Sequence, residues 1–249
     1  MSAPLLLAHG AAGTIRANFG PLISTLSPSI TAFGPDFPGS GDTPRTTGPL
    51  RLDDLADHLV ASAAGIETFA VLGYSMGCAV AVRAAVRYPE RVTALVLTAG
   101  TPRADAETRG RIEQWRRLAD GDRLELARFV VSVMFSEAFL GSLTEGQVES
   151  LCEFAALTMP DGASDQVDLV RHLDVTGDLA HVAVPTLVIG TMRDRLVTPA
   201  SMRAYADGIS GARWAELDSG HLPAVEASGQ WARLVEQFHA EIRWDELDR

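Results

Sequence analysis

Short apolar segments alternate with longer segments of helical periodicity along most of this chain, and this alternation restricts the folds that it can adopt. Strands that are buried on both faces of a sheet are uninterrupted apolar runs, and the chain has such runs at 5–8, 69–72, 92–97 and 184–189. Residues 52–63 and 231–242 instead repeat apolar side chains at intervals of three and four, which indicates amphipathic helices. With weaker strand patterns at 30–33 and 213–217, the order predicts an α/β fold whose parallel sheet is covered on both faces.

One long interval breaks the alternation. No strand pattern occurs in it, and its helical patterns lie at 112–118, 124–135, 144–159 and 164–173. A helical stretch of this length inside an α/β alternation is an insertion, and its amphipathic character predicts a lid over one edge of the sheet. We therefore expect a core made of residues 1–102 and 181–249 and a helical lid made of residues 103–180.

The charge balance excludes several kinds of partner and chemistry. The chain has 249 residues, of which 21 are basic and 32 are acidic, and its net charge is −11. Because nucleic acids and anionic membranes attract basic surfaces, neither is expected as a partner. All of the basic residues are arginine, so a catalytic lysine is excluded. There is no basic leader and no apolar stretch long enough to span a bilayer, so we expect a cytoplasmic protein.

The chain has two cysteines, Cys78 and Cys152, both in predicted helices. Two cysteines do not make a disulfide framework or a zinc cluster. We predict that both are buried and behave as small apolar side chains. No metal or organic cofactor is expected.

The segment Gly73-Tyr74-Ser75-Met76-Gly77 connects a predicted strand to a predicted helix. A strand that turns directly into a helix forces the middle residue of the turn into a strained backbone, and flanking glycines remove Cβ atoms from a crowded place. The Ser75 hydroxyl then stands at the carboxyl end of a strand and at a helix N-terminus, where a developing anion is favoured. We therefore predict that Ser75 is a catalytic nucleophile rather than a simple helix cap.

A serine nucleophile needs a base and an acid that orients the base. His221 follows the last predicted strand, which places it on a loop at the same sheet edge as Ser75, and we predict that it is the general base. Asp194 comes just after the preceding predicted strand and is the predicted orienting acid. Asp105 and Asp218 are rivals, although Asp218 lies three residues from His221 and is awkwardly placed to orient that ring. Four other histidines are predicted to lie on the surface: His58, His172, His181 and His239.

Two backbone N–H groups are expected to hold the oxyanion that forms when a serine attacks a carbonyl carbon. One belongs to Met76, the residue after the nucleophile, and the other comes from the loop after the first strand. That loop is His9-Gly10-Ala11-Ala12-Gly13, whose small side chains let the backbone approach a substrate. We assign the second donor to Ala11, with Ala12 as the alternative, and interpret His9 as a hydrogen-bonded brace of the loop.

Taken together, these residues resemble the α/β-hydrolase superfamily over nearly the whole chain. The resemblance also rests on Asp36-Phe37-Pro38-Gly39-Ser40-Gly41, Tyr88-Pro89-Glu90-Arg91-Val92, Val184-Pro185-Thr186-Leu187-Val188-Ile189-Gly190 and Ser219-Gly220-His221. It implies a triad in the chain order Ser75, Asp194, His221, with oxyanion donors at Ala11 and Met76.

One departure from the family concerns the first strands. Members usually begin with an antiparallel strand pair, whereas the His-Gly loop of this chain begins at residue 9, so we expect that pair to be missing. The resemblance then predicts six parallel strands in the order 4-3-5-6-7-8 of the family's strand numbering. The edge strand left open in this way could promote a homodimer.

The resemblance implies a serine hydrolase that cleaves a small-molecule carboxylic ester or lactone through an acyl-enzyme. Small bacterial carboxylesterases, enol-lactonases and haloperoxidase-like perhydrolases are nearest in character. The alternatives are a thioesterase acting on a thioester substrate, a C–C bond hydrolase, a cyclase or lyase, and a ligand-binding protein of low turnover. We expect about half of the large apolar side chains of the lid to line the substrate pocket, out of Trp115, Phe129, Met134, Phe135, Phe139 and Phe154.

Overall fold

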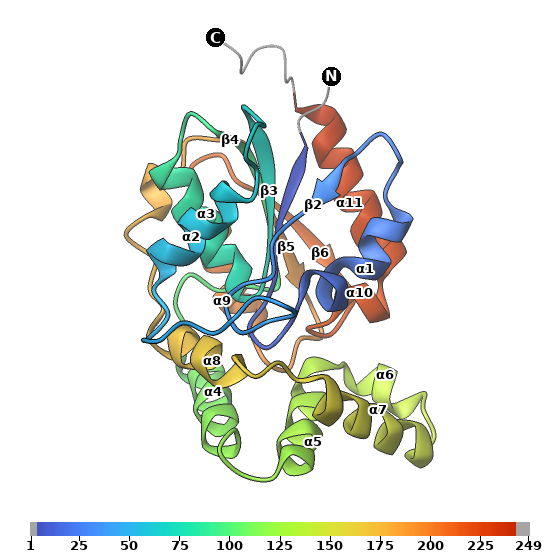
Figure 1. Ribbon diagram of the computed structural model, residues 1–249. Helices are drawn as coiled ribbons and strands as arrows, with labels where there is room; N and C mark the ends of the chain where they lie inside the picture. Colours follow the sequence, from blue (N-terminus) through green and yellow to red (C-terminus); the bar gives the residue numbers. More distant parts are fainter. Residues whose placement is uncertain (1–3, 243–249) are drawn as a thin grey trace.

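A six-stranded, wholly parallel sheet forms the centre of the protein in the computed structural model, which describes residues 4–242 (Figure 1). The strands are β1 (Leu5–Ala8), β2 (Ala32–Phe33), β3 (Phe69–Tyr74), β4 (Val92–Thr98), β5 (Thr186–Thr191) and β6 (Arg213–Leu217). Their order across the sheet is β2-β1-β3-β4-β5-β6, which confirms the predicted strand number, direction and order. The weakest of the predicted strands is also the shortest, since β2 has only two residues.

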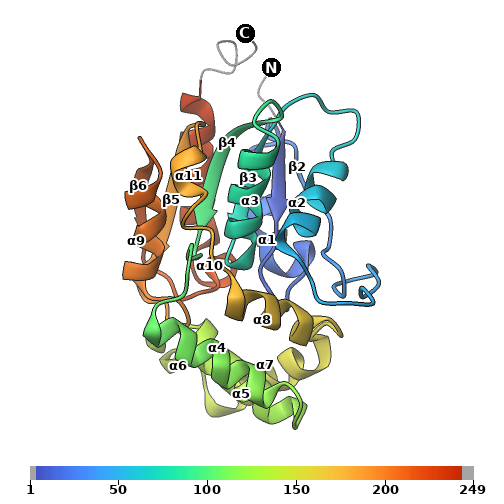
Figure 2. The same ribbon diagram turned by 90° about the vertical axis from the view of Figure 1, so that its left-hand side faces the viewer.

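Helices cover both faces of the sheet (Figure 2). One face carries α1 (Ile15–Thr25), α10 (Pro223–Glu226) and α11 (Ser228–Glu241), and the other carries α2 (Leu52–Ala61), α3 (Met76–Arg87) and α9 (Pro199–Gly208). Side chains of a strand alternate between the two faces. In β1, Leu5 and Leu7 accordingly join one buried cluster, whereas Leu6 and Ala8 join the other. Strands such as β1 are continuous apolar runs in the sequence because both faces of the sheet are buried.

Five helices lie between β4 and β5 in the sequence and pack beyond the carboxyl ends of the strands (Figure 1). We call them the inserted helices: α4 (Ala106–Leu118), α5 (Arg123–Met134), α6 (Glu137–Gly141), α7 (Glu145–Thr158) and α8 (Ala163–His172). A short 3₁₀ helix (Leu179–His181) precedes β5. No helix among the described residues is long and apolar enough to cross a membrane.

Strand register brings the predicted site loops together. Ala8 at the end of β1 pairs with Gly73 of β3, so the loop after β1 begins beside the turn that holds Ser75. Thr191 at the end of β5 pairs with Leu217 at the end of β6, so the loops that follow these strands are also neighbours. Parallel strands place all of these loops at one edge of the sheet.

Helix α9 was not among the predicted elements, although the sequence marks its start. The Thr198 hydroxyl accepts the Ser201 N–H, and Pro199 occupies the first turn of the helix. Both residue types are favoured at these positions because a helix begins with N–H groups that lack internal partners. This stretch lacks a long apolar stripe, which is why periodicity alone did not reveal it.

Candidate active site

Ser75 lies in the turn between β3 and α3 with a backbone φ of 54°, a conformation that residues with a side chain rarely adopt. The flanking glycines are needed because the turn is crowded. A Cβ at Gly73 would collide with the Gly77 carbonyl, and a Cβ at Gly77 would collide with the Ala8 carbonyl. Without these side chains, strand and helix approach closely enough to hold the serine hydroxyl clear at the sheet edge.

The imidazole of His221 contacts the Ser75 hydroxyl. Its Nε2 lies 3.0 Å from Ser75 Oγ, and the residue is buried. Tyr74, which precedes Ser75, donates its hydroxyl to the backbone carbonyl of His221 at 2.8 Å. Burial raises the pKa of the Tyr74 phenol well above its ordinary value, so this group stays a hydrogen-bond donor. The strand that precedes the predicted nucleophile therefore also fixes the backbone of the predicted base.

Asp194 binds the other side of the imidazole. Its Oδ2 lies 2.7 Å from His221 Nδ1 and accepts the Thr191 hydroxyl at 2.9 Å. Its Oδ1 accepts the backbone N–H groups of Leu196 and Val197 at 2.8 and 2.9 Å. These bonds hold the carboxylate in one orientation. Because the ring nitrogen that faces a carboxylate carries the proton, Nε2 of the neutral ring is free to accept the Ser75 hydroxyl.

Neither rival carboxylate takes this position. Asp105 caps α4 by accepting the Thr108 N–H at 2.8 Å, and it also accepts the Thr198 hydroxyl. Burial by itself raises the pKa of Asp105, but the hydrogen bonds that it accepts bring the pKa down to about 2. Asp218 is exposed and forms an ion pair with Arg193. The geometry therefore favours the predicted acid over both rivals.

The loop between β1 and α1 leaves the Ala11 N–H available. The Gly10 N–H donates to Asn18 Oδ1 at 2.9 Å, and the Ala12 N–H donates to Gln166 Oε1 at 2.8 Å. Between them, the Ala11 N–H has no hydrogen bond within residues 4–242, and Ala11 lines the cavity described below. Of the two alternatives, Ala11 is thus the residue whose N–H remains for a substrate oxygen.

Met76 offers a second such group. It is the first residue of α3, and the first N–H groups of a helix have no internal acceptor. Within the part of the chain that the structure describes, its N–H has no hydrogen bond, and Met76 lines the cavity next to Ser75. The two predicted oxyanion donors, Ala11 and Met76, therefore border the same space.

His9 links the loop after β1 to the segment after β2. Its Nε2 accepts the Phe37 N–H at 2.8 Å, so its Nδ1 carries the proton and donates to the Gly10 carbonyl at 2.8 Å. Burial lowers the pKa of His9 to about 4, which keeps the ring neutral near pH 7. These contacts agree with the interpretation of His9 as a brace of the loop.

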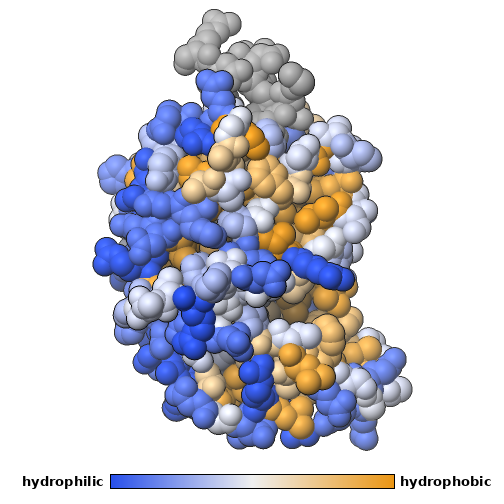
Figure 3. Space-filling view, viewed as in Figure 1, coloured by the Kyte–Doolittle hydropathy of each residue, from blue (hydrophilic) through white to orange (hydrophobic). Residues whose placement is uncertain are grey.

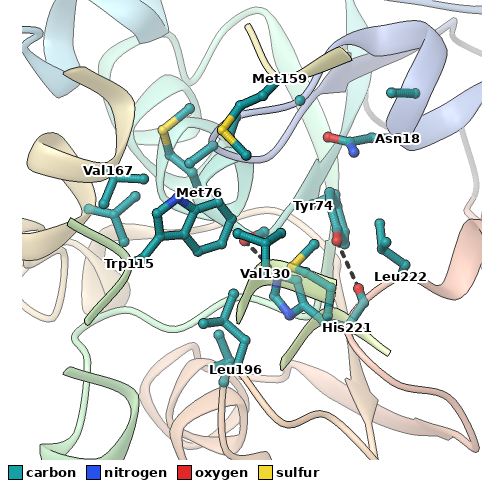
Figure 4. A pocket seen from close by; sticks show the side chains of 18 of the residues that line it. Asn18, Tyr74, Met76, Trp115, Val130, Met159, Val167, Leu196, His221 and Leu222 are labelled. Carbon is teal, nitrogen blue, oxygen red and sulfur yellow. Dashed lines mark hydrogen bonds between the residues drawn. The ribbon is translucent and has the colours of Figure 1, made fainter. Parts of the chain in front are cut away.

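A cavity of about 630 Å³ lies between Ser75 and the inserted helices (Figure 4). Its wall is mostly apolar and includes Met76, Trp115, Val130, Met159, Val167, Leu196 and Leu222. Hydrophobic side chains gather around a hollow between the core and the inserted helices (Figure 3). Phe154 of α7 lines the cavity yet is 64% exposed, which places it at the mouth.

Four of the six apolar side chains expected at this pocket line it, namely Trp115, Met134, Phe135 and Phe154. The other two, Phe129 and Phe139, pack elsewhere. Phe139 stacks on Phe135 with ring centroids 5.0 Å apart, inside a small cluster of the inserted helices. The inserted helices thus supply both a core of their own and one wall of the cavity.

Comparison with known proteins decides the family. Residues 3–228 match a family model described as alpha/beta hydrolase fold. The chain belongs to the α/β-hydrolase family. This membership agrees with the resemblance that the sequence motifs carry and with the parallel sheet.

Named relatives of this α/β hydrolase are hydrolases and esterases. It is 31% identical to a pyrrolizixenacetamide deacetylase of Xenorhabdus hominickii, over 94% of this chain and 90% of the relative. It is 33% identical to a pimeloyl-[acyl-carrier protein] methyl ester esterase of Xanthomonas campestris, over 96% of this chain and 95% of the relative. The solved enol-lactonase of Burkholderia xenovorans shares its fold, with a TM-score of 0.82 at 22% identity over 97% of this chain and 93% of that one.

Two polar side chains that the sequence did not single out join the inserted helices of this α/β hydrolase to the loops of the site. The first is Gln166 of α8, whose amide contacts Ala12, Pro38 and Ser40. The second is Glu226 of α10. No local pattern marks either residue, because their partners lie far away in the sequence.

The Glu226 carboxylate joins the loop of the predicted base to helix α6. It accepts the Gly220 N–H at 3.2 Å and both the N–H and the hydroxyl of Ser136, which is the N-cap of α6. The approach is close, since a Cβ at Gly220 would collide with Ser136 and with Glu226. The position of His221 next to Gly220 therefore depends in part on an inserted helix.

The prediction of four surface histidines is wrong for His239, which is buried on α11. This residue lies four and eight positions after Val235 and Trp231, so it continues their inward stripe. His172 and His181 are exposed as expected, and His58 is half-buried. Both cysteines are buried, as predicted.

Proposed function

We propose that this α/β hydrolase is a serine hydrolase that cleaves a small-molecule carboxylic ester or lactone through an acyl-enzyme. One observation carries the proposal: the Ser75, His221 and Asp194 side chains form a continuous hydrogen-bonded series, and Ser75 and His221 line an apolar cavity. A serine activated in this way attacks carbonyl carbon, and the cavity supplies a place for the acyl or alcohol part of the substrate. As part of this proposal, residues 103–180 form the lid of the site.

The first half of the reaction makes the acyl-enzyme. His221 Nε2 takes the hydroxyl proton while Ser75 Oγ bonds to the carbonyl carbon, and the carbonyl π electrons move to its oxygen. The N–H groups of Ala11 and Met76 hold that oxyanion. Asp194 keeps the proton on Nδ1 and stabilises the imidazolium. When the tetrahedral intermediate collapses, Nε2 returns its proton to the leaving alcohol oxygen.

The second half releases the acid. Water gives a proton to His221 Nε2 and attacks the acyl carbon, and the same two N–H groups hold the second oxyanion. Collapse of that intermediate breaks the bond to Ser75 Oγ, which regains its proton from His221. Apart from the substrate and this water, the groups that the two halves use are side chains and N–H groups of the protein.

The cavity favours substrates with an apolar part. Its wall has one charged side chain, Arg16, which is exposed. The named relatives hydrolyse a methyl ester or remove an acetyl group according to their names, and both are acyl-carbon cleavages. These features support a neutral or largely apolar ester as substrate. Thioesters and amides are related acyl donors whose rates of hydrolysis can be compared with that of the ester.

Hydrolysis of p-nitrophenyl hexanoate by three variants tests the proposal. Ser75→Ala and Asp194→Asn should each lower kcat by about 10⁴-fold or more, because the one lacks the nucleophile and the other misorients the imidazole. Asp218→Asn is the matched control, since this exposed rival has no contact with the ring, and its kcat should stay within about twofold of the wild-type value. Unchanged hydrolysis in Ser75→Ala would refute the proposal.

A covalent probe separates an enzyme from a ligand-binding protein. An alkyl fluorophosphonate should add one phosphonyl group to the wild type, seen by intact mass, and the group should map to Ser75. His221→Ala should react far more slowly. A protein that binds the hexanoate ester without releasing p-nitrophenol would instead favour the ligand-binding alternative.

A further inference from the structure

The loop that offers the Ala11 N–H contains a strained residue. Ala12, directly after Ala11, has a backbone φ of 57°, which is unfavourable for a residue with a Cβ. Such a conformation is strained and persists only where surrounding contacts hold it. Among the hydrogen bonds of the described residues, the one that holds the Ala12 N–H comes from the side chain of Gln166.

The Gln166 side chain is completely buried, and both ends of its amide form hydrogen bonds. Its Oε1 accepts the Ala12 N–H at 2.8 Å, while its Nε2 donates to the Pro38 carbonyl at 3.1 Å and to Ser40 Oγ at 2.9 Å. An N–H partner requires the carbonyl oxygen and a carbonyl partner requires the NH₂ group, so the orientation of the amide is unambiguous. One side chain thus joins two core loops that lie 128 and 154 positions away.

Other contacts dock the same end of α8 without touching the β1–α1 loop. The Gly162 N–H donates to the Gly39 carbonyl at 2.9 Å, and the two glycines approach so closely that neither could carry a Cβ. Arg45 forms an ion pair with Asp165 at 2.8 Å. The contacts of Gly162 and Asp165 thus help to dock α8 (Figure 2), and they can be removed without breaking the hold on the Ala12 N–H.

We propose that Gln166 is a positioning residue for oxyanion stabilisation: its amide fixes the strained Ala12 and so keeps the neighbouring Ala11 N–H directed at the substrate oxygen. This proposal rests on the proposed function. The Ala12 N–H and the Ala11 N–H belong to consecutive peptide groups that share the Ala11 Cα, so a displacement of the Ala12 backbone also moves the Ala11 N–H. The residue acts from an inserted helix, which makes the anion-binding geometry of the core dependent on that helix.

The test uses a trifluoromethyl ketone, 1,1,1-trifluorooctan-2-one. Ser75 Oγ adds to its carbonyl carbon, the Oγ proton passes to His221, and the resulting hemiketal oxyanion occupies the anion site without a leaving group to lose. Its inhibition constant, Ki, reports on oxyanion stabilisation in the active molecules alone. A purely structural defect lowers the fraction of active enzyme and hence the apparent kcat, but it leaves Ki unchanged.

Gln166→Met retains the bulk of the side chain and removes all three hydrogen bonds. We expect its Ki to rise about 10- to 100-fold and kcat for the hexanoate ester to fall by a similar factor, because loss of a single oxyanion donor typically costs 10²–10³ in kcat. KM should stay within about threefold. Gln166→Asn is a second variant, for use if Gln166→Met does not fold. Its side chain is too short to reach all of the partners of Gln166, so we expect the same changes in Ki and kcat.

Arg45→Met is the matched control, because it breaks the ion pair with Asp165 at the same docking region and leaves the loop contact intact. Its Ki and kcat should lie within about twofold of the wild-type values. A wild-type Ki in a folded Gln166 variant overturns this inference while leaving the proposed function standing. A wild-type protein that neither hydrolyses the ester nor binds the ketone overturns the proposed function instead.

Discussion

The hydroxyl of Tyr74 donates a hydrogen bond of 2.8 Å to the backbone carbonyl of His221, so the residue before the serine holds the loop of the imidazole. The two aromatic rings also pack with centroids 5.4 Å apart. In consequence, the buried core helps to set the distance between Ser75 and His221. The contact leads directly to a first prediction.

Tyr74→Phe should lower both stability and turnover. It leaves a buried carbonyl unpaired, which typically costs ~1–3 kcal/mol of unfolding free energy, and it frees the His221 backbone, so kcat should fall several-fold. Urea denaturation and ester hydrolysis measure the two effects. Tyr205→Phe is the matched control, because the buried Tyr205 hydroxyl also binds a backbone carbonyl, that of Thr101, at 3.1 Å. A similar stability loss with unchanged kcat is expected there, and an equal loss of kcat in both variants would count against the special role of Tyr74.

Backbone strain at Ser75 predicts an order of stability for two inactive variants. Glycine adopts a φ of 54° without a steric penalty, whereas alanine does not. Ser75→Gly should therefore exceed Ser75→Ala in unfolding free energy by about 1 kcal/mol. Thermal unfolding of the two proteins gives the comparison, and both should be inactive. A more stable alanine variant would show that the turn is not strained.

The buried His9 predicts loss of stability in mild acid. Burial lowers its folded-state pKa to about 4, while the unfolded chain retains a pKa near 6.5. Between these values the unfolded state binds more protons, so the unfolding free energy falls as pH drops from about 6.5 to about 4, by roughly 3 kcal/mol at most. Urea titrations across this window measure the slope.

A glutamine at the same position isolates the contribution of the ring. His9→Gln offers an oxygen to the Phe37 N–H and does not titrate, so the slope of unfolding free energy against pH should become flatter. His181→Gln is the control, since His181 is exposed, and its slope should match that of the wild type. Identical slopes in all three proteins would assign the acid sensitivity to other groups.

The apolar cavity predicts a preference for longer acyl chains. Each buried methylene contributes about 0.8 kcal/mol, which corresponds to roughly a fourfold rise in kcat/KM for each carbon until the cavity is filled. The p-nitrophenyl esters from acetate to octanoate provide the series, with Ser75→Ala as the background. Val130→Phe, which reduces the space in the wall, should lower kcat/KM for octanoate at least tenfold while acetate changes less than threefold. A flat profile in the wild type would place the acyl chain outside this cavity.

Local sequence patterns were sufficient to predict the strands and their parallel direction, whereas the order of the strands was predicted from the family resemblance. Buried strands such as β3 and β4 are continuous apolar runs, and parallel strands place the loops that follow them at one edge, so the meeting of Ser75 with His221 and Asp194 could be anticipated from strand positions. The two-residue β2 and the short stripe of α9 gave weaker signals, because little apolar surface distinguishes them.

Contacts between distant side chains could not be predicted in this way. The amide of Gln166 reaches Ala12, 154 positions away, and a polar residue in an amphipathic helix has no feature that reveals such a partner. His239 shows the converse error, since a polar residue type occupies a buried position of the α11 stripe. In both cases tertiary packing, which a local pattern does not contain, determines the environment of the side chain.

Two hydrogen-bonded contacts between the inserted helices and the core affect how a substrate could reach the cavity. The Gln166 side chain joins α8 to the loop that contains Ala11. The Glu226 side chain joins the start of α6 to the loop that contains His221. Movement of the inserted helices away from the sheet would break both contacts, so the loops of the predicted oxyanion donor and the predicted base would each lose a supporting hydrogen bond. We therefore expect a substrate that passes the exposed Phe154 to disturb these two loops less than an outward movement of the inserted helices would.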